Sequence, residues 1–188
     1  GFEGVYERRT IPLNSGNVLN AHMNAGTILG SSNRGSTKGR EEEFLKAFGE
    51  LKLDGLIAAG GDGTFEGLSR VIRGLKLIGV PKTIDNDLQG TDVTFGFDTA
   101  CAVVAEAVDA LRATADAHSR VFVVEAMGRT AGWIALGGGL ASYADAILIP
   151  ERPVSRDAFK KFLLNLKNTG RRGAMVVVGE GTHFENES

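Results

Sequence analysis

IAAGGDGTFEG, residues 57–67, runs from an apolar stretch through a cluster of glycines into a helical pattern. Before the glycines, LIAA has the length and composition of a short buried strand. After them, apolar residues recur at helical spacing at Phe65, Leu68 and Val71. The stretch therefore predicts a strand, a glycine turn and a helix. Such a turn leaves backbone N–H groups free at a helix start and lets an anion approach closely, which favours a phosphate site.

The same alternation continues on both sides of this stretch. Helical patterns of ten or more residues between short apolar strands are typical of βα units in a parallel sheet. We therefore expect an α/β fold: a doubly wound, mostly parallel sheet with helices on both faces. Functional residues should then follow the carboxyl ends of the strands. Strands are expected at residues 56–59, 77–80, 120–126, 146–150 and 174–180, and helices at 41–53, 65–75, 98–117, 130–140 and 155–169.

The composition fits one globular domain over residues 1–188 and excludes several functional classes. The chain is 43% hydrophobic and 23% charged, and its net charge of −2 is scattered along the sequence. No basic surface is therefore expected for nucleic acid or an acidic membrane. No apolar run is long enough to cross a bilayer. Cys101 is the single cysteine and cannot form an internal disulfide, so we expect a reducing, cytoplasmic location.

Asp62 lies in the middle of the glycine turn, where a carboxylate would repel a bound phosphate. A divalent cation between them removes this conflict, and Mg²⁺ prefers hard oxygen ligands. Asp62 is thus a candidate metal-side residue in a nucleotide or pyrophosphate site. The alternative is an aspartate that caps the following helix.

PKTIDND, residues 81–87, follows the next strand and carries two carboxylates, an amide, a hydroxyl and a lysine. In an extended conformation Asp85 and Asp87 project to the same side. One of them could remove a proton from an attacking hydroxyl while the other orients it or helps to hold a metal. A turn with Asx caps would explain each polar residue singly.

Taken together, the motifs resemble the phosphofructokinase family over nearly the whole chain. The matching segments are GGDGTFEG, PKTIDNDLQGTDVTFGFDTA, RVFVVEAMGRTAGWIAL, ILIPE and VVVGEG, in this order. GGDGT alone is shared with diacylglycerol-type lipid kinases and NAD kinases, whereas PKTIDND and the MGR segment are specific. The resemblance implies a phosphoryl-donor side in residues 1–80 and a sugar-phosphate side in residues 81–188.

The resemblance implies that the protein is a 6-phosphofructokinase of glycolysis, which phosphorylates the 1-hydroxyl of fructose 6-phosphate with Mg²⁺. Asp85 matches the catalytic base, Thr83 a residue beside the transferred group and Arg129 a residue near the developing charge. Asp62 matches the Mg²⁺-associated aspartate. The donor-binding matches are Gly61, Asp62, Gly63, Thr64, Gly67 and Lys82. The substrate-binding candidates are Thr83, Asp85, Asp87, Arg120, Met127, Gly128, Arg129 and Glu180.

Several of these residues have simpler interpretations from the sequence alone. Arg129 could be a surface residue, Arg120 a solvated flank of its strand and Glu180 an edge carboxylate. Met127 and Trp133 are interpreted as packing residues, although a methionine backbone could still face the sugar. In the family the arginine that Arg120 matches reaches the sugar phosphate of a neighbouring subunit, so the resemblance implies a homo-oligomer, a dimer or a tetramer.

The residues around the donor give a mixed indication. Gly63 leaves room for a nucleotide α-phosphate, where pyrophosphate-dependent members carry aspartate, whereas Lys82 resembles the pyrophosphate type. We favour ATP, because an aspartate at position 63 would obstruct the α-phosphate, while a lysine can serve either donor. A pyrophosphate-dependent phosphofructokinase remains the alternative.

Two further alternatives belong to other classes, namely a GGDGT-type lipid or NAD kinase and a non-catalytic regulatory homologue. The family's first strand has no counterpart before Gly1, and its C-terminal segment has none after Ser188. We therefore expect a fragment that is inactive by itself.

Overall fold

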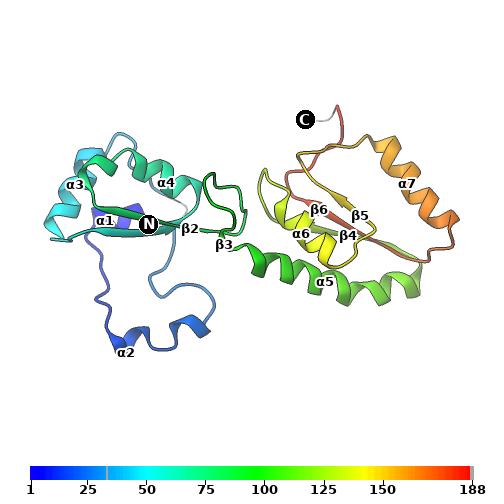
Figure 1. Ribbon diagram of the computed structural model, residues 1–188, viewed down its shortest axis with the longest axis horizontal. Coiled ribbons are helices and arrows are strands. Elements are labelled where there is room, and N and C mark those ends of the chain that lie inside the picture. The colour runs from blue at the N-terminus through cyan, green and yellow to red at the C-terminus, as the bar shows by residue number, and fades with distance from the viewer. Residues whose placement is uncertain (33, 187–188) are drawn as a thin grey trace. The chain divides into compact units, whose positions relative to one another are not determined.

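The computed structural model describes residues 1–32 and 34–186, which form two compact units, Gly1–Val80 and Pro81–Ser188. Each unit is described by itself (Figure 1). The boundary between the units falls within strand β2, Leu77–Thr83.

The first unit is built around strand β1 and the start of β2. Its other elements are α1 (Phe2–Tyr6), α2 (Ser15–Val18), α3 (Glu41–Glu50), β1 (Leu56–Gly60), α4 (Asp62–Ser69) and two 3-10 turns, Ala21–Met23 and Ile72–Gly74. Its core joins Tyr6, Phe44, Leu68 and Val71, all of which are buried. The Phe44 ring packs edge-on against Tyr6, so α1 and α3 share this core.

Residues 36–40 are fastened to this core. The buried Thr37 hydroxyl donates to the Gly67 carbonyl (2.6 Å), and the Tyr6 hydroxyl donates to the Ser36 carbonyl (2.9 Å). Arg40 lies over the Tyr6 ring and pairs with Glu43. The positive charge of Arg40 is therefore engaged by partners within the first unit.

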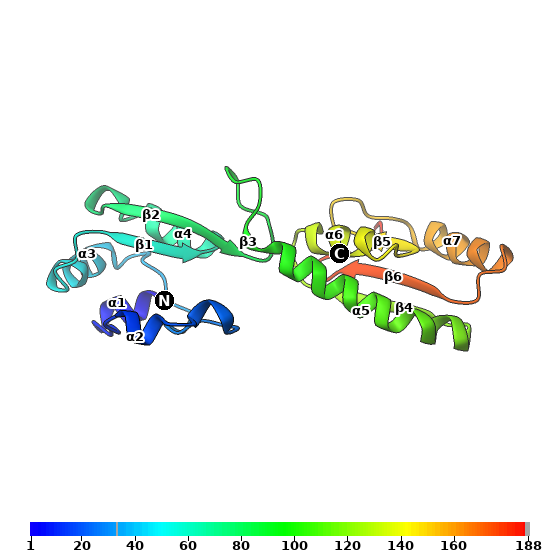
Figure 2. The same ribbon diagram turned by 60° about the horizontal axis from the view of Figure 1, so that its bottom comes forward.

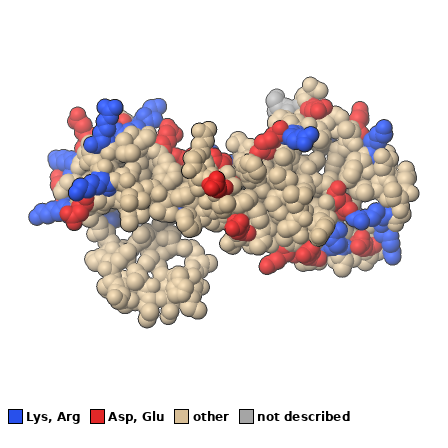
Figure 3. Space-filling view, in the orientation of Figure 1, with Lys and Arg blue, Asp and Glu red and all other residues tan. Residues whose placement is uncertain are grey.

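Residues 10–32 form an exposed segment without a single lysine, arginine, aspartate or glutamate. Figure 3 shows this segment free of charge, whereas both signs are mixed over the rest of the face in view. Apolar side chains such as Leu19 (72% exposed) and Met23 (74% exposed) lie on its surface.

The second unit contains the end of β2 and a three-stranded sheet with its helices. Its elements are β3 (Phe95–Gly96), α5 (Phe97–His118), β4 (Val121–Ala126), α6 (Trp133–Ala141), β5 (Ala146–Leu148), α7 (Arg156–Asn168) and β6 (Ala174–Gly179). β3 pairs in parallel with the end of β2 in the sheet order β1-β2-β3. The other sheet has the order β4-β6-β5, with both pairings parallel. The carboxyl ends of these three strands therefore meet at one edge.

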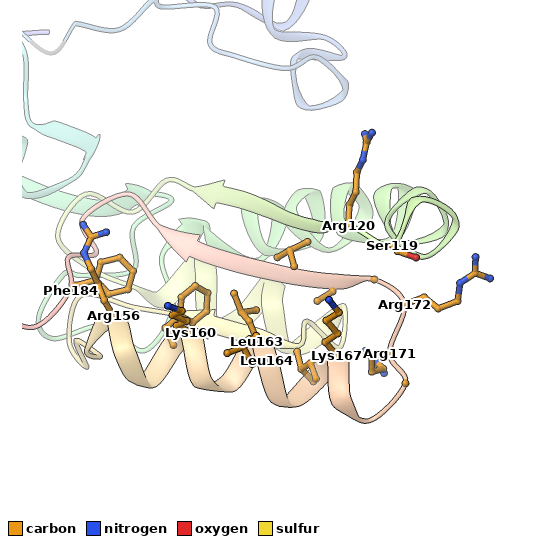
Figure 4. A pocket seen from close by; sticks show the side chains of 16 residues that line it. Ser119, Arg120, Arg156, Lys160, Leu163, Leu164, Lys167, Arg171, Arg172 and Phe184 are labelled. Atoms are coloured by element: carbon orange, nitrogen blue, oxygen red, sulfur yellow. The ribbon is translucent and has the colours of Figure 1, made fainter.

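Helices cover both faces of the sheet β4-β6-β5. α5 and α6 pack against each other on one face (Figures 1 and 2), where Val108, Ile134 and Met175 form the core. α7 lies against the other face, where Phe159 and Leu163 help to line a groove of about 830 Å³ (Figure 4).

The predicted fold class is confirmed, and each of the ten predicted helices and strands is present near its expected place. The bounds of one helix were wrong: the helix expected at 65–75 spans Asp62–Ser69, and Ile72–Gly74 form a separate 3-10 turn. The strands are divided between two sheets, and α1, α2 and β3 were not predicted. These elements are short, and α1 is held by its contact with α3 rather than by a sequence pattern. Among the described residues, no helix has the length and apolarity needed to span a membrane.

Candidate functional site

The glycine turn of the first unit lies between β1 and α4, as predicted. The backbone N–H groups of Thr64 and Phe65 donate to the Gly61 carbonyl (3.0 and 3.1 Å), which closes the first helical turn. A Cβ atom at Gly60 would lie 2.3 Å from the Thr64 hydroxyl, so only glycine permits this close turn. The N–H groups that precede Thr64 have no intrahelical partner and are suited to bind an anion.

Asp62 is the first residue of α4 and is exposed. The N-cap is Gly61, and no side chain caps this helix, so the capping interpretation of Asp62 is wrong. In the part of the chain that the structure describes, no group of three or more histidine, cysteine, aspartate or glutamate side chains could hold a metal. Asp62 therefore fits Mg²⁺ only as a single protein ligand, with donor phosphates and water completing the coordination, as is common for this ion.

Two glycines of α4 have different surroundings. A Cβ atom at Gly63 would meet nothing within 4 Å, so there is open space beside the turn. Gly67 is buried, and a Cβ atom there would lie 2.5 Å from the Phe2 ring. Packing alone therefore accounts for glycine at position 67.

The PKTIDND segment begins at the end of β2 and turns at Asn86. Thr83 accepts the Asp85 backbone N–H on its hydroxyl oxygen (3.2 Å), and Asn86 has a positive φ of 55°. The Asn86 side-chain oxygen accepts the Thr94 N–H (2.9 Å) and fixes the loop. The turn interpretation thus explains the presence of Thr83 and Asn86. It does not explain the carboxylates of Asp85 and Asp87.

Asp85 is half-buried and electrostatically linked to four predicted site residues. Burial raises the pKa of its carboxyl group, and the nearby charge of Asp87 adds to this effect. The Thr83 hydroxyl and the Arg129 cation lower the same pKa, whereas Glu180 raises it. The second unit therefore gathers these five residues into one cluster around a carboxyl group that is suited to accept a proton.

The loop between β4 and α6 presents Arg129 in an unusual backbone conformation. Arg129 has a φ of 55° and Gly128 a φ of 141°. A Cβ atom at Gly128 would lie 2.4 Å from the Ala131 carbonyl oxygen, which explains glycine at this position. A positive φ in a residue other than glycine costs conformational energy and must be held in place by neighbours.

Two carboxylates provide that support. Glu180 follows β6, and its Oε1 accepts the N–H groups of Gly128 (3.0 Å) and Arg129 (2.5 Å). Glu151 follows β5, and its Oε1 accepts the Gly132 N–H (2.8 Å). Glu180 is therefore more than an edge carboxylate, because it binds the backbone of the loop. Glu151 was not predicted, although it follows its strand in ILIPE much as Glu180 follows its strand in VVVGE.

Four other residues are placed less centrally. Arg120 precedes β4, at the opposite end of the strand from Arg129, and borders the groove beside α7 (Figure 4). Lys82 is exposed on β2 and belongs to the second unit. Met127 (64% exposed) and Trp133 (48% exposed) are on the surface, so their interpretation as packing residues is wrong in this structure.

Comparison with known proteins identifies close relatives. The family model described as phosphofructokinase matches residues 1–188. ATP-dependent 6-phosphofructokinase 1 of Thermus thermophilus is 43% identical over 194 residues, which cover 97% of this chain and 58% of that protein. The pyrophosphate–fructose 6-phosphate 1-phosphotransferase of Dictyoglomus thermophilum is 46% identical over 188 residues, which cover 98% of this chain and 54% of that protein. The chain thus spans somewhat more than half the length of these relatives.

Solved structures agree with these sequence relatives. Phosphofructokinase of Pichia pastoris in the T-state matches with a TM-score of 0.86 and 33% identity over 98% of this chain and 22% of that one. A pyrophosphate-dependent phosphofructokinase of Marinobacter aquaeolei matches with a TM-score of 0.77 and 28% identity over 98% of this chain and 51% of that one. The relatives therefore include proteins named for either donor.

Proposed function

The chain belongs to the phosphofructokinase family, and we propose that the complete protein transfers a phosphoryl group from ATP to fructose 6-phosphate. The product is fructose 1,6-bisphosphate, and the reaction is a step of glycolysis. The observation that carries this proposal is the cluster around Asp85, in which a half-buried carboxyl group with a raised pKa lies near a second carboxylate and Arg129. A base with a pKa closer to neutral accepts a proton more effectively than an ordinary aspartate.

In the proposed reaction Asp85 takes the proton of the sugar 1-hydroxyl while the oxygen of that hydroxyl attacks the terminal phosphorus of ATP. The bond from that phosphorus to the bridging oxygen breaks, and ADP leaves. Thr83 and Arg129 steady the moving phosphoryl group, and Asp87 orients Asp85. Such transfers depend on positioning and charge stabilisation rather than on covalent chemistry from the protein. Met127 and Gly128 are proposed to contact the sugar phosphate, and Glu180 is proposed to bind the sugar hydroxyls.

The first unit is proposed to hold the donor. Its N–H groups at Gly61 and Gly63, together with the Thr64 hydroxyl, would bind phosphate oxygens, and Asp62 would be the protein ligand of Mg²⁺. When bound, Mg²⁺ would supply positive charge that neutralises the donor phosphates. The exposed carboxylate of Asp62 and the absence of a helix-capping hydrogen bond support this role.

ATP is proposed as the donor because of the open space beside Gly63. Apart from adjacent residues and the backbone of α4 itself, no described atom lies within 4 Å of the Cβ position there, which is compatible with a nucleotide α-phosphate. Lys82 would pair with donor phosphates of either kind. Pyrophosphate is the second candidate donor, because the Dictyoglomus relative is named for it.

Two further points belong to this proposal. Arg120 is proposed to reach the sugar 6-phosphate of a neighbouring subunit, in a homo-oligomer. Its place before β4, at the opposite end of the strand from Arg129, supports a separate role. A cytosolic location is proposed from the single, unpaired Cys101.

The test of the base is a comparison of two aspartates in one loop. Asp85→Asn in the complete protein is expected to lower kcat about 10²–10⁴-fold. Asp92→Asn is the matched control, because Asp92 is an exposed carboxylate of the same loop. Fructose 1,6-bisphosphate formation is measured with Mg²⁺ and ATP. Equal activities of the two variants would contradict the role of Asp85.

The test of the donor uses position 63. Gly63→Asp is expected to raise KM for ATP strongly, because its carboxylate would occupy the space beside the turn and repel the α-phosphate. Glu66→Asp, a conservative change at an exposed residue one turn along α4, is the control. An unchanged KM for ATP in Gly63→Asp would show that this space does not accommodate the nucleotide.

A further inference from the structure

The loop that carries Arg129 is held at both ends by carboxylates that follow other strands. Glu180 binds the beginning of the loop, at Gly128 and Arg129, and Glu151 binds its end, at Gly132. Within the loop, the Ala131 N–H donates to the Gly128 carbonyl (2.9 Å). The β4–α6 loop is therefore fixed mainly by two side chains that are distant in sequence. Glu151 is 19 residues from Gly132, and Glu180 is 51 residues from Arg129.

The contact of Glu151 with Gly132 needs an unusually close approach. A Cβ atom at Gly132 would lie 2.7 Å from Oε2 of Glu151 and 2.4 Å from the Cβ atom of Ile149. Any side chain at position 132 would thus push the carboxylate away from the backbone. Glycine at this position and glutamate at position 151 fit one another.

The contact also replaces an ordinary helix cap. Gly132 is the N-cap of α6, and it has no side chain that could cap the helix. In a capping box the N-cap N–H is bound by a glutamate three residues later in the same helix. Here the glutamate comes from the segment after β5, so the bond links the start of α6 to a neighbouring strand end. A negative charge at this end of a helix is also favoured by the helix dipole.

We propose that Glu151 is a positioning residue for Arg129, and this rests on the proposed function, in which Arg129 contacts the transferred group. Glu180 binds the Arg129 N–H directly, but it contacts only the beginning of the loop. Without a second contact, the end of the loop at Gly132 could change its position. Glu151 removes that freedom, so that the positive φ of Arg129 is kept and its guanidinium stays aimed at the reacting phosphoryl group. Glu151 itself touches no substrate in this account.

The first readout is independent of activity. Hydrogen exchange is measured on a peptide covering residues 127–136 of the complete protein. Glu151→Ala should speed exchange in this peptide about 10-fold or more, since the Gly132 N–H loses its acceptor. Glu151→Gln keeps an acceptor oxygen and should exchange nearly as the parent does. Glu106→Ala, an exposed glutamate on α5, is the control.

The second readout asks whether Glu151 acts through Arg129. Glu151→Ala should lower kcat about 10- to 100-fold in the parent protein, as expected for a misplaced catalytic group. In an Arg129→Ala background Glu151→Ala should lower kcat little further, because the guanidinium that Glu151 positions is already absent. Glu151→Gln should restore most of kcat.

The outcomes separate this inference from the proposed function. Unchanged exchange in Glu151→Ala, or an equal loss of kcat with and without Arg129, would overturn the positioning role. A parent protein that makes no fructose 1,6-bisphosphate with either donor would overturn the proposed function. The exchange measurement would then still decide whether Glu151 holds the loop.

Discussion

Asp85 and Asp87 are two carboxylates of one loop, and the charge of Asp87 contributes to the raised pKa of Asp85. Asp87→Asn removes this charge, so the pKa of Asp85 should fall. Because the base must be ionised to accept a proton, the acid limb of the pH profile of kcat/KM should move to lower pH. The profile of the Asp92→Asn variant should match that of the parent. An acid limb that stays in place, or moves to higher pH, would contradict the assigned coupling.

The buried threonines Thr37 and Thr94 provide a matched pair for stability. The Thr37 hydroxyl donates to the Gly67 carbonyl, whereas the Thr94 hydroxyl is buried without a partner among the described residues. Thr37→Val should destabilise the protein by about 1–2 kcal/mol, while Thr94→Val should be neutral or stabilising by up to about 1 kcal/mol. Urea unfolding checks both values. A clear loss for Thr94→Val would indicate a hidden partner of this hydroxyl.

Single residues differ in how far the sequence could reveal their roles. Asp85, Asp87 and Arg129 were predicted as site residues because they follow strands in recognisable motifs. Glu151 follows its strand in the same way, but its importance depends on Gly132 lying opposite, which is a tertiary contact. For Gly67, the motif match to the donor site gave no indication that the Phe2 ring would fill the space beside it.

At the scale of elements, the glycines of α6 are explained by close packing. A Cβ atom at Gly138 would lie 2.6 Å from the Val104 side chain of α5. Gly138→Ala should therefore destabilise the protein by about 1–3 kcal/mol, although alanine is the better helix former. Gly49 of α3 has no atom within 4 Å of its Cβ position, so Gly49→Ala should stabilise by up to about 1 kcal/mol. Thermal unfolding compares the two, and equal effects would contradict the packing account.

Long elements were predictable because their periodicity was strong. The amphipathic pattern of α7 and the apolar run of β6 gave both elements almost at their observed bounds. β3 has only two residues, Phe95 and Gly96, and forms because β2 offers a pairing edge. Such an element depends on its partner and has no periodicity of its own.

At the scale of the whole molecule, the sequence predicted strands with parallel order but not their division into the sheets β1-β2-β3 and β4-β6-β5. Apolar strand patterns do not specify which strands become neighbours, because pairing is decided by tertiary packing. The assignment of residues 1–80 to the donor and of residues 81–188 to the sugar phosphate remains a proposal. It predicts that Gly63→Asp raises KM for ATP and that Arg129→Lys chiefly affects kcat and KM for fructose 6-phosphate.

That division can be contradicted by steady-state kinetics of the complete protein. If Gly63→Asp raised KM for the sugar and left KM for ATP unchanged, the first unit would not be the donor side. Glu66→Asp is the control on α4, and Asp92→Asn is the control in the second unit.

The proposed function is tested most directly by the stoichiometry of the reaction of the complete, unaltered protein. Fructose 6-phosphate and Mg²⁺ are supplied with either ATP or pyrophosphate, and fructose 1,6-bisphosphate, ADP and phosphate are quantified. We predict one fructose 1,6-bisphosphate for each ADP with ATP, and no product with pyrophosphate. Product from pyrophosphate alone would contradict the choice of donor, and ADP without fructose 1,6-bisphosphate would contradict the transfer to the sugar.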